Sequence, residues 1–354
     1  LKDQPVPEGQ HLLEVDDLKM YFHTEDGVVR AVDGVSYTLD RGETLGVVGE
    51  SGSGKSVTAM TIMGLISMPP GKIEGGDVRY RGRSILEMTE EEMQHIRGND
   101  IAMIFQDPMT SLNPVYKIGK QVGEGLRLHR GYSKQEALKR ATELLDLVGI
   151  PEPEKRVNEY PHQFSGGMRQ RVMIAMALAC DPDILIADEP TTALDVTIQA
   201  QIIELMQEMQ EKNGNAIIMI THDLGVVADM ADKIMVMYAG RPVEFGTAEE
   251  IFYESRHPYT WGLIRSIPEQ AIDEKKPLTP IHGNPPSLMN LPEGCVFSPR
   301  CPYATDKCRK QRPERFVTES GHYSACHYSG DPEFLKNAPE TSRTRKDSKK
   351  GGEA

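Results

Sequence analysis

One short segment carries the residue types that bind phosphate groups. GESGSGKS fits the pattern G-x-x-x-x-G-K-[ST] from Gly49 to Ser56, after an apolar run and before a helical pattern. Glycines let backbone N–H groups turn inward around phosphate oxygens, and the following helix adds the positive end of its dipole. We expect Lys55 to reach the β- and γ-phosphates of a nucleotide and Ser56 to bind Mg²⁺. A chance glycine turn is the alternative. The predicted nucleotide-binding residues here are Gly49, Glu50, Ser51, Gly52, Ser53, Gly54, Lys55, Ser56 and Val57.

A second group of polar residues follows apolar runs that read as strands. Asp188 and Glu189 end the run ILIADEP, at the strand edge where parallel sheets bind ligands. Asp188 can hold the Mg²⁺ shell, and Glu189 can polarise the water that attacks the γ-phosphate. Gln106 can touch Mg²⁺ and this water, and His222 can hydrogen-bond the γ-phosphate. An acid pair at a helix start and ordinary polar loop residues are the alternatives. The predicted catalytic residues are Glu189, His222 and Gln106, and the predicted Mg²⁺ ligands are Ser56, Gln106 and Asp188.

Four cysteines near the end of the chain form a third group. They are separated by five, six and seventeen residues, at Cys295, Cys301, Cys308 and Cys326. Four thiolates suit Zn²⁺ or an iron–sulfur cluster, and the spacing indicates a metal without naming it. His322 and His327 are close enough in the sequence to serve as spare zinc ligands. Disulfides and scattered free thiols are the alternatives. Cys180 is expected to be buried packing on a helix.

Strand patterns alternate with helical patterns along most of the chain. Residues 183–190 and 215–223 are apolar runs with helical patterns between and after them, and residues 11–40 read as two strands joined by a turn. Ser133 and Glu136 form a capping box before a helix with the apolar face Ala137, Leu138, Ala141, Leu144, Leu145 and Val148. The alternation predicts an α/β fold with a mostly parallel sheet covered on both faces.

Length and composition limit the class of protein. The 354 residues suffice for one large and one smaller domain. A formal charge of −13, from 40 basic and 53 acidic residues, argues against nucleic acid as the main partner. No apolar run approaches the roughly 18–20 residues of a membrane span. The polar start LKDQPVPEGQ is unlike a secretion signal, so we expect a cytoplasmic protein without structural disulfides. Residues 331–354 are expected to be disordered.

Further motifs give residues 12–266 a resemblance to the ATP-binding-cassette (ABC) transporter ATPases. The deciding element is FSGGMRQR, which resembles the signature motif of that family. It departs mildly from the usual pattern, because Phe164 and Met168 stand where the family has Leu and Gln. TTALD, which ends at Asp195, resembles the D-loop.

The resemblance also assigns roles to single residues. Gln106 and His222 match the Q-loop and the switch histidine, and Phe22, with Tyr21 as the second choice, matches the aromatic residue that stacks on adenine. In such ATPases two cassettes face head to tail, and each ATP lies between one phosphate loop and the partner's signature. The signature residues expected at the partner's ATP are Ser165, Gly166, Gly167 and Met168. Two glycines at a helix start are an anion site by themselves, which agrees with this role; a plain helix start is the alternative.

The implied fold is an ABC-type cassette of the P-loop NTPase class over residues 1–266. It would combine a mostly parallel sheet core, an antiparallel β subdomain and a helical subdomain at about residues 107–180. A Cys-rich, metal-binding C-terminal segment would follow at residues 267–330, beginning with a Pro-rich linker.

The C-terminal segment has a narrower resemblance. Residues 282–308, HGNPPSLMNLPEGCVFSPRCPYATDKC, resemble the C-terminal region of dipeptide and oligopeptide permease ATPases. That family implies a [4Fe–4S] cluster on Cys295, Cys301, Cys308 and Cys326, with zinc as the alternative. Residues 257–268 recur there too and are expected to pack this segment onto the cassette. Residues 111–122 resemble the region that forms the groove for a coupling helix of the membrane subunit.

This resemblance implies the D-type ATPase subunit of a peptide importer. Its partners would be a second, F-type ATPase, two membrane permeases and, through them, a solute-binding protein, at the cytoplasmic face of the cell membrane. An importer of nickel or another solute is the nearest alternative. A non-transport cassette ATPase in DNA repair or translation is disfavoured, since the chain lacks a coiled-coil insertion and a second cassette. A redox sensor built on a cassette is a third alternative, because of the cysteines.

Overall fold

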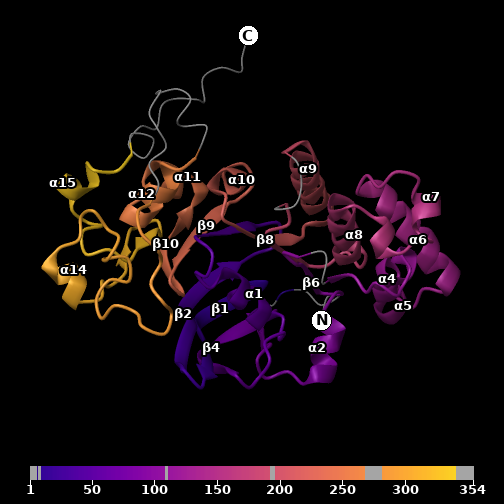
Figure 1. The fold of residues 1–354 in the computed structure, drawn as a ribbon, viewed down its shortest axis with the longest axis horizontal. Coiled ribbons are helices and arrows are strands. Elements are labelled where there is room, and N and C mark those ends of the chain that lie inside the picture. Colours follow the sequence, from indigo (N-terminus) through magenta and orange to yellow (C-terminus); the bar gives the residue numbers. More distant parts are fainter. Residues whose placement is uncertain (1–5, 7–8, 108–110, 192–195, 268–280, 340–354) are drawn as a thin grey trace, which may run out of the picture.

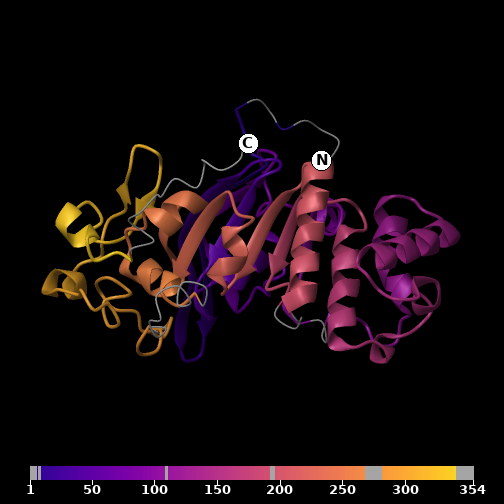
Figure 2. The ribbon, with the colours of Figure 1, turned by 90° about the horizontal axis from the view of Figure 1, so that it is seen from above.

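The architecture places two peripheral regions at opposite ends of a central pair of sheets. In the computed structural model, residues 6, 9–107, 111–191, 196–267 and 281–339 are described. Figures 1 and 2 show a helical region at one end and the C-terminal segment at the other, with the strands between them. The phosphate loop and the polar residues that follow the strands therefore lie in the central part.

The main sheet is parallel over its central strands, as the alternating pattern predicted. Its strand order is β11-β12-β10-β9-β3-β8-β7-β6. The five parallel strands are β3 (Thr44–Val48), β6 (Ile101–Ile104), β7 (Ile184–Asp188), β8 (Ala216–Thr221) and β9 (Lys233–Tyr238). Three antiparallel strands extend one edge: β10 (Arg241–Thr247), β12 (Tyr323–Ser324) and β11 (Phe316–Val317).

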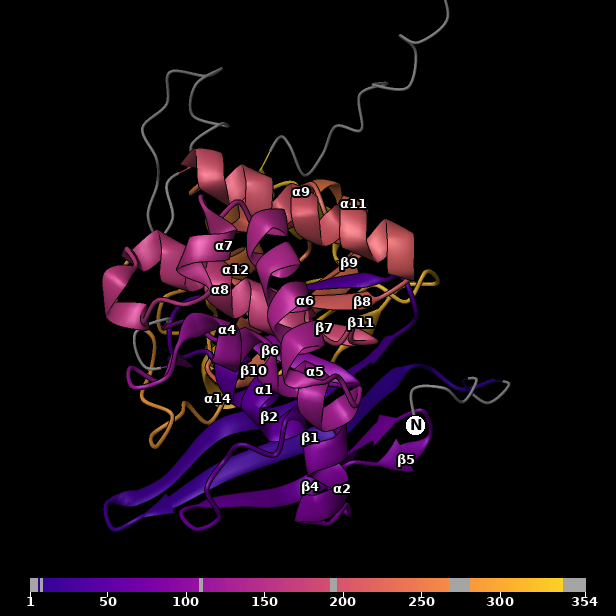
Figure 3. The same cartoon turned by 90° about the vertical axis from the view of Figure 1, so that its right-hand side faces the viewer.

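A second, antiparallel sheet packs against one face of the main sheet. Its order is β2-β1-β4-β5, with β1 at Leu13–Thr24, β2 at Gly27–Leu39, β4 at Gly71–Tyr80 and β5 at Arg83–Ser84. Figure 3 shows this sheet below the main sheet, with α2 (Glu90–Ile96) beside it. Helix α1 (Lys55–Ile62) buries Ala59 and Ile62 in the same apolar cluster as both sheets.

Strand β7 shows why the central strands carry apolar side chains on both faces. Ile184 and Ile186 join the cluster shared with the antiparallel sheet, whereas Leu185 and Ala187 join the cluster under the helices. A parallel strand covered on both faces needs apolar side chains on both sides of its pleat. The helices on the second face are α9 (Val196–Asn213), α10 (Leu224–Ala228) and α11 (Ala248–Tyr253).

The helical region contains the predicted capping box. It comprises α4 (Ile118–Val122), α5 (Glu124–His129), α6 (Lys134–Leu147), α7 (Pro153–Arg156) and α8 (Gly166–Leu178). Ser133 and Glu136 make reciprocal hydrogen bonds at the start of α6. The predicted apolar face is buried except Leu138, which is 37% exposed and lines a groove. Cys180 is buried as expected, but α8 ends at Leu178, so the helix does not include it.

The C-terminal segment is joined to the cassette by strands and by aromatic packing. β12 extends the main sheet through β10. Helix α12 (Pro258–Ile264) places Tyr259 5.3 Å from Phe297 and Trp261 5.7 Å from Tyr303, measured between ring centroids. These contacts confirm the packing role expected for residues 257–268.

Part of the segment 331–354, which we expected to be disordered, is folded. Helix α15 (Pro332–Leu335) is formed, and its Phe334 ring lies 5.4 Å from Trp261. The segment also contains α14 (Asp306–Lys310). Among the described residues, no helix combines the length and apolar character needed to cross a membrane.

Candidate functional site

The phosphate loop connects β3 to α1 in a conformation that requires glycine at two positions. Gly49 has φ 151° and Gly54 has φ 99°. A Cβ atom on Gly49 would lie 2.2 Å from the carbonyl oxygen of Met237, and one on Gly54 would lie 2.2 Å from that of Ala31. A side chain is therefore excluded at both positions, and the tight turn between them can direct backbone N–H groups toward a phosphate.

Lys55 lies inside this loop. Its side chain is buried, and Nζ donates to the carbonyl oxygens of Gly49 (2.6 Å) and Glu50 (3.0 Å). Burial lowers the pKa of Lys55, while the charges of Glu189, Asp188 and Glu50 act in the opposite direction. Phosphate oxygens would bind this ammonium more strongly than neutral carbonyl oxygens do.

A hydrogen bond joins the loop to the neighbouring strand. Ser56 Oγ donates to Asp188 Oδ1 at 3.0 Å, which brings the first turn of α1 to the carboxyl end of β7. Burial raises the pKa of Asp188, and the adjacent Glu189 charge acts in the same direction. A hydroxyl and a carboxylate at one point are the oxygen ligands that Mg²⁺ prefers, so these residues fit the predicted cation.

Glu189 is held between the other two predicted catalytic residues. Gln106 Nε2 donates to Oε2 at 3.0 Å, and His222 Nδ1 lies 3.3 Å from Oε1. The backbone of Glu189 has φ 48°, and its N–H donates to the carbonyl oxygen of Ile220 at 2.9 Å. A left-handed backbone is uncommon at a non-glycine residue, so surrounding contacts must maintain this conformation at Glu189. The structure therefore brings Gln106, Asp188, Glu189 and His222 to the edge that also carries Lys55 and Ser56.

The geometry distinguishes the two candidates for the adenine-stacking residue. Tyr21 OH donates to Asp33 at 2.9 Å, so this side chain has a partner on its own face of β1. Phe22 is the next residue along β1 and is half-buried. This arrangement favours Phe22 over Tyr21.

The signature segment forms the start of a long helix. Ser165 caps α8 by accepting a hydrogen bond from the Met168 N–H at 3.3 Å. Ser165 and Gly166 are exposed, and nothing lies within 4 Å of a Cβ built on Gly166. Phe164, the departure from the family pattern, is buried in the helical region. Asp195 lies outside the described residues.

One contact that we did not predict ties this helix to the catalytic turn. Gln170 Nε2 donates to the carbonyl oxygen of Pro190 at 2.7 Å, and Gln170 is buried. The signature helix is thereby connected to the residue that follows Glu189.

The four clustered cysteines come together but do not form a ready metal site. The thiols influence each other electrostatically, and all five cysteines of the chain are free. No group of three or more His, Cys, Asp or Glu within the described part of the chain is arranged to hold a metal ion. The predicted metal-binding geometry of Cys295, Cys301, Cys308 and Cys326 is therefore not seen.

The protonation of these thiols follows from their surroundings. Burial raises the pKa of Cys301 to about 11 and that of Cys326 to about 12, and burial raises that of Cys295 too. Backbone N–H groups oppose the shift, from Phe297 and Ser298 at Cys295, from Tyr303 at Cys301 and from Tyr328 at Cys326.

The two histidines considered as spare ligands have other partners. His322 is buried against Glu244, at 3.0 Å, and His327 Nε2 lies 2.9 Å from the carbonyl oxygen of Gln311. Each ring therefore has a protein partner in this structure, and a role as a spare zinc ligand stays a prediction.

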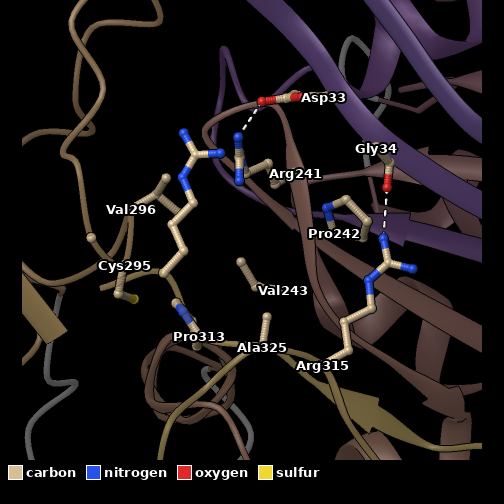
Figure 4. A pocket seen from close by; sticks show the side chains of 12 residues that line it. Asp33, Gly34, Arg241, Pro242, Val243, Cys295, Val296, Pro313, Arg315 and Ala325 are labelled. Atoms are coloured by element: carbon tan, nitrogen blue, oxygen red, sulfur yellow. Dashed lines mark hydrogen bonds and ion pairs between the residues drawn. The ribbon is translucent and has the colours of Figure 1, made fainter. Parts of the chain in front are cut away.

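Two hollows lie away from the phosphate loop. A cavity of about 140 Å³ lies between the cassette and the C-terminal segment. Figure 4 shows two arginines beside it: Arg241 forms an ion pair with Asp33, and Arg315 donates a hydrogen bond to the carbonyl oxygen of Gly34. A groove of about 770 Å³ crosses the helical region and is lined by exposed Val115, Tyr116 and Leu138, with lysines and an arginine around them.

Comparison with known proteins identifies the family. The family model for "ABC transporter" matches residues 32–192, and that for "Oligopeptide/dipeptide transporter, C-terminal region" matches residues 243–308. The oligopeptide transport ATP-binding protein OppD of Bacillus subtilis is 58% identical over 312 residues, which are 88% of this chain and 87% of that protein. The chain belongs to the oligopeptide/dipeptide family of ABC transporter ATP-binding proteins. It is accordingly an ABC-type ATPase.

Other relatives agree with this assignment. The dipeptide transport ATP-binding protein DppD of Escherichia coli is 52% identical over 320 residues, 90% of this chain and 97% of that protein. Among solved structures, the dimeric ATP-binding cassette MJ0796 bound to ADP and Pi is similar with a TM-score of 0.61 and 29% identity. The likeness covers 67% of this chain and 98% of that one, which confirms the predicted cassette fold.

Replacing Glu189 by Gln should separate ATP binding from hydrolysis. The amide keeps the shape and the contacts with Gln106 and His222 but cannot polarise water, so hydrolysis should fall at least about 100-fold. The affinity for Mg²⁺-ATP should stay within about threefold, a free-energy change below ~0.7 kcal/mol. Phosphate release and equilibrium nucleotide binding measure the two effects. Glu204→Gln, at an exposed position on α9, is the matched control, and normal turnover by Glu189→Gln would contradict the assigned role.

Proposed function

We propose that this chain is the ATP-hydrolysing subunit of a peptide importer and that its own set of catalytic residues is competent for hydrolysis. The supporting observation is the Glu189 carboxylate, held by Gln106 and His222 beside the loop that contains Lys55. The relatives named for oligopeptide and dipeptide transport support the peptide class of substrate, as does the matching C-terminal region.

The residues divide the reaction among themselves. Lys55 exchanges its carbonyl contacts for the β- and γ-phosphates, and the loop N–H groups hold the remaining phosphate oxygens. Ser56, Asp188 and Gln106 would hold Mg²⁺, which neutralises charge on the phosphates. Glu189 accepts a proton from the attacking water, and His222 donates a hydrogen bond to the γ-phosphate. Phe22 stacks on the adenine.

The partner chain would complete the site. A second cassette brings its signature to the γ-phosphate, and the signature of this chain serves the partner in return. Ser165 and Gly166 are exposed at the start of α8, as such a role requires, and Gly167 and Met168 follow in the same turn. Because Gln170 contacts Pro190, movement of α8 reaches the turn after Glu189. ATP would thus hold two ATPase subunits together, and hydrolysis would release them.

The groove over the helical region suits a membrane partner. Its exposed Val115, Tyr116 and Leu138 offer an apolar floor, and Lys117, Lys120, Arg127 and Lys134 surround it with positive charge. An amphipathic helix of a permease subunit fits such a groove. This contact would hold the chain at the cytoplasmic face of the membrane, next to two permeases that receive solute from a binding protein.

We also propose that the four cysteines bind a [4Fe–4S] cluster, with zinc as the alternative. Thiolates formed on metal binding would be stabilised by the backbone N–H groups directed at Cys295, Cys301 and Cys326. The cluster would serve as a structural staple or a sensor.

Deleting this chain from its host tests the transport proposal. Uptake of radiolabelled trialanine should be lost, should return with the wild-type chain and with Glu204→Gln, and should not return with Glu189→Gln. Radioactive nickel uptake is measured in the same strains. Intact peptide uptake together with lost nickel uptake would contradict the peptide assignment and leave the ATPase activity standing.

Metal and sulfide analysis of anaerobically purified protein tests the cysteine proposal. About four irons and four sulfides per chain, with a brown chromophore, are expected for the cluster. Cys301→Ser should lose the metal, whereas Cys180→Ser, which changes the buried cysteine outside the group, should keep it. One zinc without colour would replace the cluster by a zinc site, and full metal retention in Cys301→Ser would contradict four-cysteine ligation.

A further inference from the structure

A single arginine of the cysteine segment reaches into the phosphate loop. Arg300 Nη1 lies 2.5 Å from Glu50 Oε2, and Nη2 lies 3.0 Å from Oε1. We propose that Arg300 is a positioning residue for ATP: it fixes the loop through Glu50 and neutralises a carboxylate beside the bound triphosphate. The inference rests on the proposed ATP site and adds a residue that lies far from it in the sequence.

The guanidinium is held rigidly by its own segment. Nε donates to the carbonyl oxygen of His282 at 2.9 Å, and Nη2 also donates to that of Ile281 at 3.2 Å. Nη1 donates to Tyr238 OH at 3.3 Å, at the end of β9. The Arg300 side chain is only 4% exposed and that of Glu50 is 30% exposed, so the guanidinium is shielded from the water and salt that weaken surface ion pairs, and the carboxylate is shielded in part.

Three hydrogen-bonding groups of Glu50 are held by three different residues. Its carboxylate meets Arg300, its N–H donates to Tyr259 OH at 2.8 Å, and its carbonyl oxygen accepts from Lys55 Nζ. Tyr259 belongs to α12 and packs against Phe297 of the cysteine segment. The residue that follows the first loop glycine is thereby held by the C-terminal segment on one side and by the phosphate-binding lysine on the other.

Charge gives this contact a role beyond packing. The Glu50 carboxylate acts electrostatically on Lys55, together with Asp188 and Glu189, so three negative groups already surround one ammonium. A triphosphate adds more negative charge at the same place. Without Arg300, Glu50 would repel the nucleotide, and we expect a loss of at least about tenfold in affinity, the repulsion of like charges about 12 Å apart at an effective dielectric near 20. The bidentate geometry lets arginine compensate the carboxylate in a way that lysine cannot reproduce.

The contact also makes ATP binding depend on the cysteine segment. Arg300 directly precedes Cys301, and the Phe297 ring lies 5.2 Å from Tyr238. A change that loosens the segment would withdraw the guanidinium and leave the Glu50 charge exposed to the nucleotide.

Three variants test the charge role, because removing the positive charge and removing the negative charge should change ATP affinity in opposite directions. Arg300→Gln should weaken Mg²⁺-ATP binding about tenfold and raise KM for ATP, with kcat within about twofold, because Glu189 and its partners are unchanged. Glu50→Gln, which leaves Arg300 uncompensated next to the phosphates, should bind ATP about fivefold more tightly. The double variant should return to within about twofold of wild type. Arg309→Gln, an exposed arginine of the same segment, is the matched control.

Each result decides the proposal. ATP affinity unchanged in Arg300→Gln, or lowered in Glu50→Gln, would overturn it. A double variant as weak as Arg300→Gln would show a packing role, which also overturns it. Thermal unfolding of each variant identifies loss of fold, and in that event Glu50→Gln alone decides. Lys55→Ala, measured alongside, separates the two proposals: unchanged ATP affinity in that variant would refute the ATP site itself.

Discussion

Parallel pairing of β3, β8, β7 and β6 brings the chemistry of this chain to one edge. Val48 lies opposite Thr221, Asp188 opposite Ile220, and Ile104 opposite Ala187, so the strands end almost level with one another. The loop after each strand therefore delivers its first residues to the same place. Both faces of these strands are packed, so a one-residue slip would turn each set of apolar side chains toward the layer that fits the other set. The site is thus a consequence of how the sheet is covered.

Incomplete charge compensation is the second feature of this edge. Lys55 is buried against carbonyl oxygens, and Asp188 is buried against a hydroxyl. Burial moves both pKa values toward the neutral forms, lowering that of Lys55 and raising that of Asp188. Burial thus disfavours the charged forms of both side chains. A bound polyphosphate would stabilise the charged lysine, and a divalent cation would stabilise the charged aspartate. The two groups are therefore placed for ligand binding, at a cost to the stability of the ligand-free fold. Glu189, with its left-handed backbone, adds a third constrained group at the same point.

Much of the fold and of the candidate site could be predicted from the sequence, because short local patterns indicate them. The loop at Gly49–Ser56, the acid pair after β7 and the capping box of α6 each depend on residues a few positions apart. Other features of the structure were not apparent from the sequence. Leu138 fits the apolar periodicity of α6 but lines a groove, and His322 pairs with Glu244 in the body of the sheet. Arg300 stands within the cysteine motif that we did recognise, yet no local pattern indicates that its partner is Glu50, 250 residues away.

The way the C-terminal segment joins the cassette could not be predicted from local sequence patterns either. Its strands β11 and β12 consist of two residues each, too short for an alternating pattern to reveal, and they join the main sheet only because β10 offers a free edge. Trp261 of α12 also packs against Tyr303 and Phe334 of this segment. What appeared from the sequence to be a separate module is therefore packed into the cassette, close enough for Arg300 to reach the phosphate loop.

A structure of the Glu189→Gln variant with bound Mg²⁺-ATP tests the central claim most directly. The account predicts that Lys55 Nζ leaves the carbonyl oxygens of Gly49 and Glu50 for the phosphates, while Ser56 and Asp188 meet at the cation. Gln106 and His222 should turn toward the γ-phosphate, and the signature of a second cassette should lie on its other side. Nucleotide bound elsewhere, or Lys55 still on its carbonyl oxygens beneath the phosphates, would contradict it.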